Sequence, residues 1–251
     1  MIKLGFVKII EYANFNTISP PPSHGSFGRR GGVSLGSLAE LNVGHSVGDE
    51  PWRVEQNRRL IREALGVSVL VSARQVHGAG VAVVATAPDA DLELADCDAL
   101  VSTCPGVGLL ICQADCQAVM LYDPVRRVAA NVHAGWRGSA LNIIAATIAT
   151  MRRDFGCRPE DLRAVISPSL GPCCAEFINH HRELPPEFAA YQVRENHFDF
   201  WAISRDQLLV SGLLPDNIEL ARICTRCDTD FFSYRRDRAS GRNGSVIAVP
   251  A

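Results

Sequence analysis

Three short apolar runs in the middle of the chain form the clearest pattern of hydrophobic positions. They are "VGLLICQ", "AVMLYD" and "RVAANVHAG", at 107–113, 118–123 and 127–135. Short apolar runs bounded by turn residues predict strands. Because Asp123-Pro124 favours a turn between the second and third runs, we expect these two strands to pair as a hairpin.

Helices and further strands are predicted on both sides of this centre. The predicted helices span 48–66, 139–156 and 198–212. The further predicted strands span 67–78, 80–86, 162–172, 218–224 and 244–249. In the first helix Asp49 is the candidate N-cap and Gly66 the stop. The strand at 67–78 is expected to pair with the one that follows it.

The order of these elements predicts an α/β (α+β) fold. Strands alternate with helices but also occur in consecutive groups, which favours mixed β-sheets flanked by helices. With 251 residues the chain suits a single domain over 1–251. Residues 18–37, "ISPPPSHGSFGRRGGVSLGS", are rich in Pro, Gly and Ser, and this composition favours irregular structure.

Charge and composition exclude several classes of protein. Lys plus Arg is 25 and Asp plus Glu is 27, so the formal net charge of −2 gives no case for nucleic-acid binding. No apolar stretch approaches the roughly 20 residues that cross a bilayer, and the N-terminus lacks the pattern of a signal peptide. We therefore expect a cytoplasmic protein that binds neither nucleic acid nor a membrane.

Cysteines and histidines supply the first candidates for chemistry. The nine cysteines are expected to be reduced, which leaves core packing, metal binding and catalysis as roles. Cys116 and His133 lie at the same end of the predicted hairpin, and His77 ends a predicted strand. One thiolate and two imidazoles are a common catalytic zinc shell. Each of these residues alone is more often structural, and the spacing is no metal signature.

Two polar residues near these candidates could each have a functional or a structural role. Asp115, beside Cys116, could orient a ligand histidine or cap a turn. Arg137, in the segment "HAGWRG", could bind an anion through two hydrogen bonds or form a structural salt bridge.

The paired cysteines and an arginine-rich segment near the C-terminus are expected to have structural roles. Cys224 and Cys227 form a CxxC, but no second CxxC completes a four-cysteine site. Cys173 and Cys174 are adjacent, and adjacent side chains on a strand point to opposite faces. The segment "FFSYRRDRASGRNG" at 231–244 combines aromatic residues with arginines, which could grip a phosphate or form a solvated loop.

Taken together, the motifs of the chain resemble the YfiH-like family, whose members carry laccase-domain, polyphenol oxidase and purine nucleoside phosphorylase names. The matching segments, in order, are "HGSFGRRGGVS", "LN", "NRR", "RQVHG", "DCDALVS", "ADC", "HAGWRG", "SPSLGPCCAEF", "CT" and "FFSYRRD". They extend from about residue 24 to about residue 247, which leaves 1–23 as a variable N-terminal segment.

The resemblance implies a single α/β domain that holds Zn²⁺ through His77, Cys116 and His133. It also implies phosphorolysis of adenosine, inosine, guanosine and S-methyl-5′-thioadenosine, with adenosine deamination as a second activity. Our catalytic candidates are Asp115, Cys116, His133 and Arg137. The candidate substrate- and phosphate-binding residues are Arg29, Asn42, Gln75 and Arg137. The partners would be purine nucleosides and phosphate, and the protein a monomer or homodimer.

Three positions depart from the family pattern, and two other chemistries compete. Gln117 stands where the family usually has Pro, Ala175 where it has an aromatic residue, and Ser26 where it tends to have Phe. A cysteine hydrolase or amidase acting on cell-wall precursors would use Cys116 as nucleophile and His133 as base. A copper-dependent polyphenol oxidase is the remaining enzymatic alternative, although only seven histidines are present.

Overall fold

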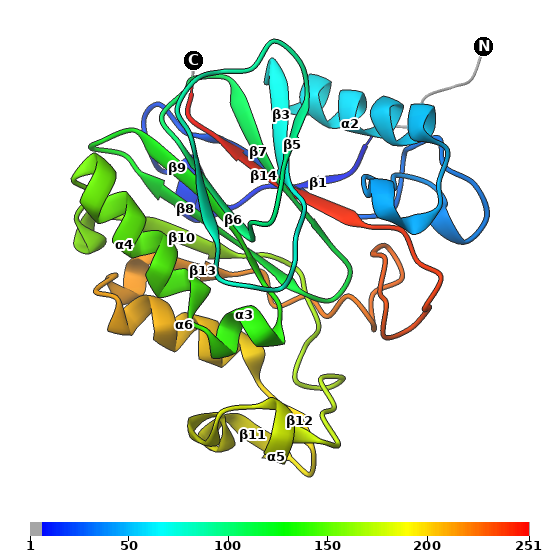
Figure 1. Cartoon of the computed structure of the whole chain (residues 1–251), viewed down its shortest axis with the longest axis vertical. Coiled ribbons are helices and arrows are strands. Elements are labelled where there is room, and N and C mark those ends of the chain that lie inside the picture. Colours follow the sequence, from blue (N-terminus) through cyan, green and yellow to red (C-terminus); the bar gives the residue numbers. More distant parts are fainter. Residues whose placement is uncertain (1–6, 251) are drawn as a thin grey trace.

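The computed structural model describes residues 7–250, whose main strands form two six-stranded sheets. The first sheet has the order β1-β2-β14-β7-β3-β5 and the second the order β13-β10-β8-β9-β6-β4, each with parallel and antiparallel pairs. A separate two-stranded sheet, β11-β12, lies with α5 beyond α3 at one end of the molecule (Figure 1). The α/β class with mixed sheets flanked by helices is confirmed.

The elements have the following bounds. The strands of the first sheet are β1 (Ile9–Ile10), β2 (Ser23–Phe27), β3 (Val69–Ala73), β5 (Leu92–Leu94), β7 (Val107–Gln113) and β14 (Asn243–Ala248). Those of the second are β4 (Val81–Val84), β6 (Ala99–Ser102), β8 (Gln117–Asp123), β9 (Val128–Ala134), β10 (Arg163–Ile166) and β13 (Ile218–Leu220). The small sheet contains β11 (Gln192–Arg194) and β12 (His197–Phe198).

Helices connect and cover the sheets. The α-helices are α1 (Ala13–Asn16), α2 (Pro51–Leu65), α3 (Trp136–Ala140), α4 (Ile143–Phe155), α5 (His180–Glu183) and α6 (Phe200–Val210). Short 3-10 helices lie at Gly36–Leu38, His45–Val47, Pro159–Asp161, Pro186–Tyr191 and Pro215–Asn217. None of the helices in the described part of the chain combines the length and the apolar character that a membrane span requires.

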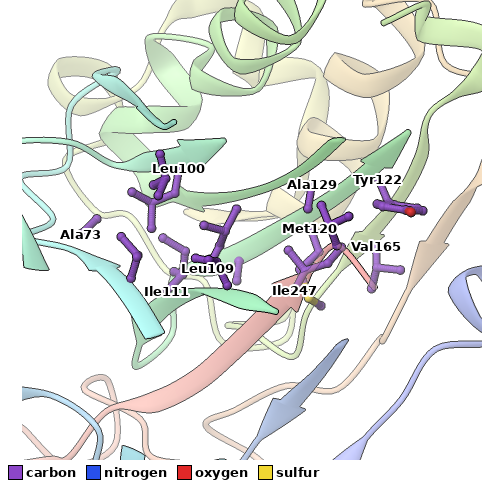
Figure 2. Close-up of a cluster of buried hydrophobic side chains, with 14 of the residues drawn as sticks. Ala73, Leu100, Leu109, Ile111, Met120, Tyr122, Ala129, Val165 and Ile247 are labelled. Atoms are coloured by element: carbon purple, nitrogen blue, oxygen red, sulfur yellow. The ribbon is translucent and has the colours of Figure 1, made fainter. Parts of the chain in front are cut away.

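The two sheets pack face to face around one hydrophobic core. Leu109 and Ile247 of the first sheet and Leu100 and Met120 of the second point into the space between them, and all four are fully buried (Figure 2). Burying one such side chain contributes roughly 1.5–3 kcal/mol. Because strands buried on both faces need apolar side chains on both, β8 and β9 are nearly continuous apolar runs.

Helices pack on the outer faces, so the molecule has four layers. On the first sheet, Ile61 of α2 packs with Leu110 and Val246. On the second, Ile144 of α4 packs with side chains of β8, β9 and α6. The order is therefore α2, first sheet, second sheet, and α4 with α6.

The predicted hairpin of β8 and β9 is present, with Gln117 opposite Ala134 and Ala118 opposite His133. One buried amide in β9 joins the two sheets. Nδ2 of Asn131 donates to the backbone oxygens of Leu109 and Ser245 at 2.8 Å each, across the core. Asn131 and His133 are two residues apart on one strand and share a face, so His133 also points toward the first sheet.

One strand pairing differs from the prediction. The strands predicted at 67–78 and 80–86 do not pair with each other, because β3 belongs to the first sheet and β4 to the second. Most of the 18–37 segment is irregular, as expected, but it contains the strand β2, which pairs with both β1 and β14. Its residues Ser-His-Gly-Ser-Phe are mostly small or polar, yet all but the first are buried.

Two helix details also differ from prediction. Asp49 does not cap α2, because its carboxylate accepts from Oγ of Ser34 and Nδ2 of Asn42. The helix predicted at 139–156 is two helices, α3 and α4, with Asn142 capping α4 from a left-handed backbone conformation.

Residues 1–6 of the predicted N-terminal segment 1–23 lie outside the described residues. The described remainder carries β1, which extends the first sheet, and α1.

Candidate metal centre and active site

Three side chains that are far apart in the sequence converge at one end of the hairpin. His77 follows β3 in a turn, Cys116 directly precedes β8, and His133 lies near the end of β9. Their potential ligand atoms all lie within 4.8 Å of one another, and Sγ of Cys116 is 3.9 Å from Nε2 of His77. The two imidazole rings meet edge to face, with their centroids 4.8 Å apart.

The carboxylate of Asp98 positions two of these three residues, His133 and His77. This fully buried carboxylate is 2.8 Å from Nδ1 of His133. It also accepts hydrogen bonds from the backbone N–H groups of Val76, His77 and Gly78, at 3.2, 2.9 and 2.8 Å. One carboxylate therefore orients the His133 ring and holds the turn that carries His77, whose φ is 59°.

Cys116 and His133 shift each other's protonation. Burial opposes ionisation of the Cys116 thiol, but the neighbouring rings of His133 and His77 together outweigh it and lower the pKa of Cys116 to about 6. Burial would lower the pKa of His133, yet the Cys116 sulfur and the Asp98 carboxylate raise it to about 9. Without a metal, the pair is therefore a thiolate beside an imidazolium at neutral pH.

Gly135 leaves room beside the cluster. A Cβ at this position would lie 2.9 Å from Cδ2 of His77 and 3.1 Å from Sγ of Cys116. Such contacts are too close for a real side chain, so the absence of one keeps the approach to the ligand atoms open.

The donor set fits a metal ion with an open coordination position. Two imidazoles and one thiolate suit zinc in catalytic sites, with a fourth position left for another ligand. The same donors suit electron-transfer copper when a methionine sulfur completes the shell. Met120 and Met151 are instead buried in the two cores that flank the second sheet. The three donors are therefore of the types that hold a catalytic metal ion.

Two cavities adjoin the cluster. Both are lined by His77, Ala114, Cys116 and Tyr234. The first, of about 570 Å³, also has the aromatic side chains of Phe177 and Phe200 in its wall. Its charged residues are mixed in sign: Arg235 and Arg238 with Asp115, Glu176 and Glu183.

The second cavity, of about 560 Å³, has a cationic lining. Arg58, Arg74 and Arg242 line it, and Glu93 is its one acidic residue. Arg74 is paired with Asp96 at 2.8 Å, and Arg58 lies 4.0 Å from Glu93. Arg58 is 3% exposed and Nε donates to the backbone oxygen of Val43 at 3.0 Å, so its position is fixed.

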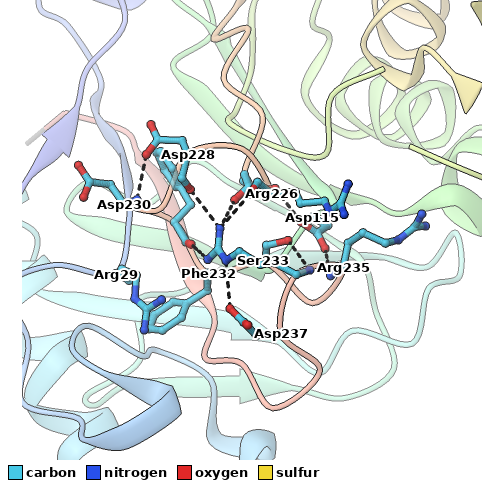
Figure 3. Close-up of polar contacts among 12 residues, drawn as sticks. Arg29, Asp115, Arg226, Asp228, Asp230, Phe232, Ser233, Arg235 and Asp237 are labelled. Atoms are coloured by element: carbon cyan, nitrogen blue, oxygen red, sulfur yellow. Dashed lines mark hydrogen bonds and ion pairs between the residues drawn. The ribbon is translucent and has the colours of Figure 1, made fainter. Parts of the chain in front are cut away.

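The predicted anion-binding residues are not gathered at these cavities. Arg29 stacks on Phe232 and donates to the backbone oxygen of Ala39 (Figure 3). Arg137 is exposed and stacks on Trp136. Neither arginine lines either cavity.

Asn42 and Gln75 have structural partners. Asn42 is fully buried, where it bonds Asp49, Gly44 and the backbone N–H of Arg242. Gln75 lines the second cavity, but both ends of its amide bond to the backbone of Cys112.

Asp115 connects loops and does not touch a ligand histidine. Its carboxylate accepts from Oγ1 of Thr225 at 2.7 Å and from the backbone N–H of Arg235 at 2.6 Å (Figure 3). The histidine-orienting carboxylate is Asp98, which sequence reasoning did not single out although it lies in the "DCDALVS" motif. The signal that could have identified it is an acidic residue directly before a strand.

The three departures from the family pattern have different settings. Gln117 lines the first cavity and anchors α6, donating to the backbone oxygen of Phe200 at 2.9 Å and bonding Ser204. Ala175 lines the same cavity, whereas Ser26 is buried between Tyr12 and Ser245, away from both cavities.

Residues 23–250 match the family model described as "Multi-copper polyphenol oxidoreductase laccase". The chain belongs to this laccase family. A relative from Bacteroides thetaiotaomicron, named purine nucleoside phosphorylase, is 32% identical over 98% of this chain and 96% of its own. Another of that name, from Streptomyces coelicolor, is 37% identical over 87% of this chain and 92% of its own.

Solved structures of this laccase family share the fold. YlmD from Geobacillus stearothermophilus superposes with a TM-score of 0.83 at 29% identity, covering 96% of this chain and 94% of that one. The Bacillus licheniformis hypothetical protein YfiH gives a TM-score of 0.80 at 32% identity, covering 90% and 92%. The resemblance to the YfiH-like family is thus confirmed.

Proposed function

We propose that this protein is a zinc-dependent purine nucleoside phosphorylase. The observation that carries the proposal is the junction of two cavities, one aromatic and one cationic, at the His77, Cys116 and His133 cluster. In phosphorolysis a phosphate oxygen replaces the purine at C1′ of the bound nucleoside, so the two substrates need adjoining subsites. The names of the two relatives support the same activity.

The nucleoside is assigned to the first cavity. Phe177, Phe200 and Tyr234 offer aromatic faces on which a purine can stack. The volume of about 570 Å³ lies in the range of small-molecule sites. The proposed substrates are adenosine, inosine, guanosine and S-methyl-5′-thioadenosine, which share the purine and differ at its edge or at the 5′ position of the sugar.

Phosphate is assigned to the second cavity because a dianion needs a cationic lining. Arg58, Arg74 and Arg242 outnumber the single acidic residue Glu93 there. In the reaction, a phosphate oxygen bonds to C1′ of the sugar while the bond from C1′ to the purine nitrogen breaks. The bonding electrons leave with the purine, which takes up a proton, and the products are the free base and pentose 1-phosphate.

The zinc ion would be held by His77, Cys116 and His133, with Asp98 orienting His133. When bound, it would supply a Lewis acid. The same centre supports adenosine deamination as a second activity, in which water replaces the amino group of the purine and ammonia leaves. Gly135 keeps the approach to the cluster free of side-chain atoms.

Product analysis with and without phosphate tests the proposal. Purified protein of known metal content is incubated with adenosine, and the products are separated by chromatography. Adenine that forms only in the presence of phosphate supports phosphorolysis, and inosine that forms without phosphate supports deamination. If neither adenine nor inosine forms, the assignment is overturned.

One observation favours a second candidate, a cysteine hydrolase or amidase. Asp98, His133 and Cys116 form a chain of the acid–base–nucleophile type, with a low thiol pKa. This alternative predicts activity without metal and inactivation by alkylation of Cys116. Zinc-dependent activity with an alkylation-protected thiol supports the phosphorylase instead.

A further inference from the structure

Four cysteines gather at a second cluster, away from the three ligands described above. Cys173 and Cys174 meet Cys224 and Cys227, and all four Sγ atoms lie within 4.8 Å of one another. On a strand, the adjacent side chains of Cys173 and Cys174 would point to opposite faces. Contrary to that expectation, both residues lie in a turn, where adjacent side chains are free to point the same way.

The sulfur separations match one metal ion and not a disulfide. Sγ of Cys227 is 3.5 Å from Sγ of Cys174 and 3.7 Å from Sγ of Cys173. In a tetrahedral zinc site with bonds of about 2.3 Å, the sulfurs are about 3.8 Å apart. A disulfide requires about 2.05 Å. We propose that Cys173, Cys174, Cys224 and Cys227 bind a structural zinc ion.

Two tight turns present the four sulfurs. In the Cys224 turn, the backbone N–H groups of Cys227 and Asp228 donate to the oxygen of Cys224 at 3.1 and 2.9 Å. In the opposing turn, the N–H of Cys174 donates to the oxygen of Gly171 at 2.9 Å. A Cβ on Gly171 would lie 3.0 Å from Cβ of Cys224, so glycine lets the two turns approach closely.

Positive charge borders this four-cysteine site. A zinc ion with four thiolates has a net charge of −2. The Arg226 guanidinium donates to Sγ of Cys174 at 3.5 Å. Arg194 donates to the backbone oxygen of Cys173 at 2.7 Å, and Arg235 to that of Cys174 at 3.4 Å. These three arginines offset the charge that the occupied site would carry.

The zinc ion would link two segments whose continuations line the first cavity. Cys173 and Cys174 directly precede Ala175, Glu176 and Phe177 of that wall, whereas the segment after Cys227 leads to Tyr234 and Arg235. Thr225 stands between two of the ligands and donates to Asp115, next to Cys116 (Figure 3). The site is structural, since Cys₄ shells leave no position open.

Metal counting tests the proposal. Purified wild-type protein should contain two zinc ions per chain by mass spectrometry of the elements. Cys227→Ser should lose the zinc ion of the four-cysteine site and retain the one at His77, Cys116 and His133. His77→Ala should lose the latter ion and retain the former. Cys104→Ser, which changes a half-buried cysteine outside both clusters, should retain two. A wild-type content of one zinc that His77→Ala abolishes would overturn the proposal.

Thiol mapping on the unmodified protein gives a second readout that does not depend on folding of a variant. Alkylation followed by peptide mass analysis should label Cys173 and Cys227, both exposed, only after a chelator has removed the metal. X-ray absorption of Cys116→Ser protein should show zinc with sulfur ligands alone. Rapid labelling without chelator, disulfide-linked peptides, or iron in place of zinc would each contradict the proposal.

Discussion

Oδ1 of Asp98 lies 2.8 Å from Nδ1 of His133, and both side chains are buried. Nδ1 of His133 is thereby engaged on its inner side, so Nε2 is the nitrogen that faces Cys116 and His77. Hydrogen bonds from the turn at 76–78 to the same carboxylate connect His77 to this arrangement. The geometry of the metal centre thus depends on one residue that is not itself a ligand.

Asp98→Asn is expected to weaken zinc binding by about 10- to 100-fold, the usual effect of removing an outer-shell partner of a ligand histidine. The zinc affinity is measured by competition with a chromophoric chelator. Asp115→Asn is the matched control, because its carboxylate bonds Thr225 and Arg235 and no ligand histidine. Equal affinities of the two variants would show that Asp98 does not orient the ligand.

Gly135→Ala should weaken zinc binding by about 5- to 150-fold, since forcing a methyl group into a packed site typically costs ~1–3 kcal/mol. The added Cβ would press on His77 and Cys116. The same titration measures the affinity, and thermal unfolding with a chelator present monitors the fold. A variant that unfolds at the wild-type temperature and binds zinc normally would contradict the expected clash.

Arg74→Gln should raise the KM for phosphate by about tenfold or more, since a hydrogen bond to a charged group contributes ~1.5–3 kcal/mol. The KM for the nucleoside should change little, because Arg74 lines only the second cavity. Arg137→Gln serves as the comparison, as Arg137 stacks on Trp136 outside both cavities. If Arg137→Gln gave the larger effect, the phosphate would be bound elsewhere.

Alkylation of Cys116 in metal-free protein should become faster as the pH rises through about 6 and then level off. The thiolate is the reactive form, and the pKa of Cys116 is lowered to about 6, so most of it is ionised at pH 7. Rates are measured by mass analysis of the peptide that contains Cys116. A rate that continues to rise up to about pH 8.5, the range of a free cysteine, would show that His133 does not stabilise the thiolate.

Local patterns predicted the elements of the fold better than their partners. The β8–β9 hairpin followed from two apolar runs around Asp123-Pro124, because turn chemistry acts over a few residues. No local pattern shows that β3 and β4 belong to different sheets, since that choice depends on side chains packed from elsewhere. β2 was missed because its small, polar residues are buried by neighbours on both sides.

Sequence motifs likewise identified some residues of the candidate site but not the contacts made between distant segments. His77, Cys116 and His133 follow from the resemblance of their motifs, and the structure brings them together. The role of Asp98 depends on a backbone turn that no sequence pattern describes. Cys173 and Cys174 were set aside by a rule for strands that does not hold in a turn, and the arginines of the second cavity come from segments far apart in the chain.

The side-chain amide of Asn131 also affects the second cavity, because that cavity is bordered by both sheets. Ala73 and Cys112 of the first sheet and His133 of the second all border that cavity. The sandwich cannot slide along its own interface without breaking both hydrogen bonds that Asn131 donates across it. The register between the two sheets, and with it the spacing of the segments that border this cavity, therefore depends on one buried amide.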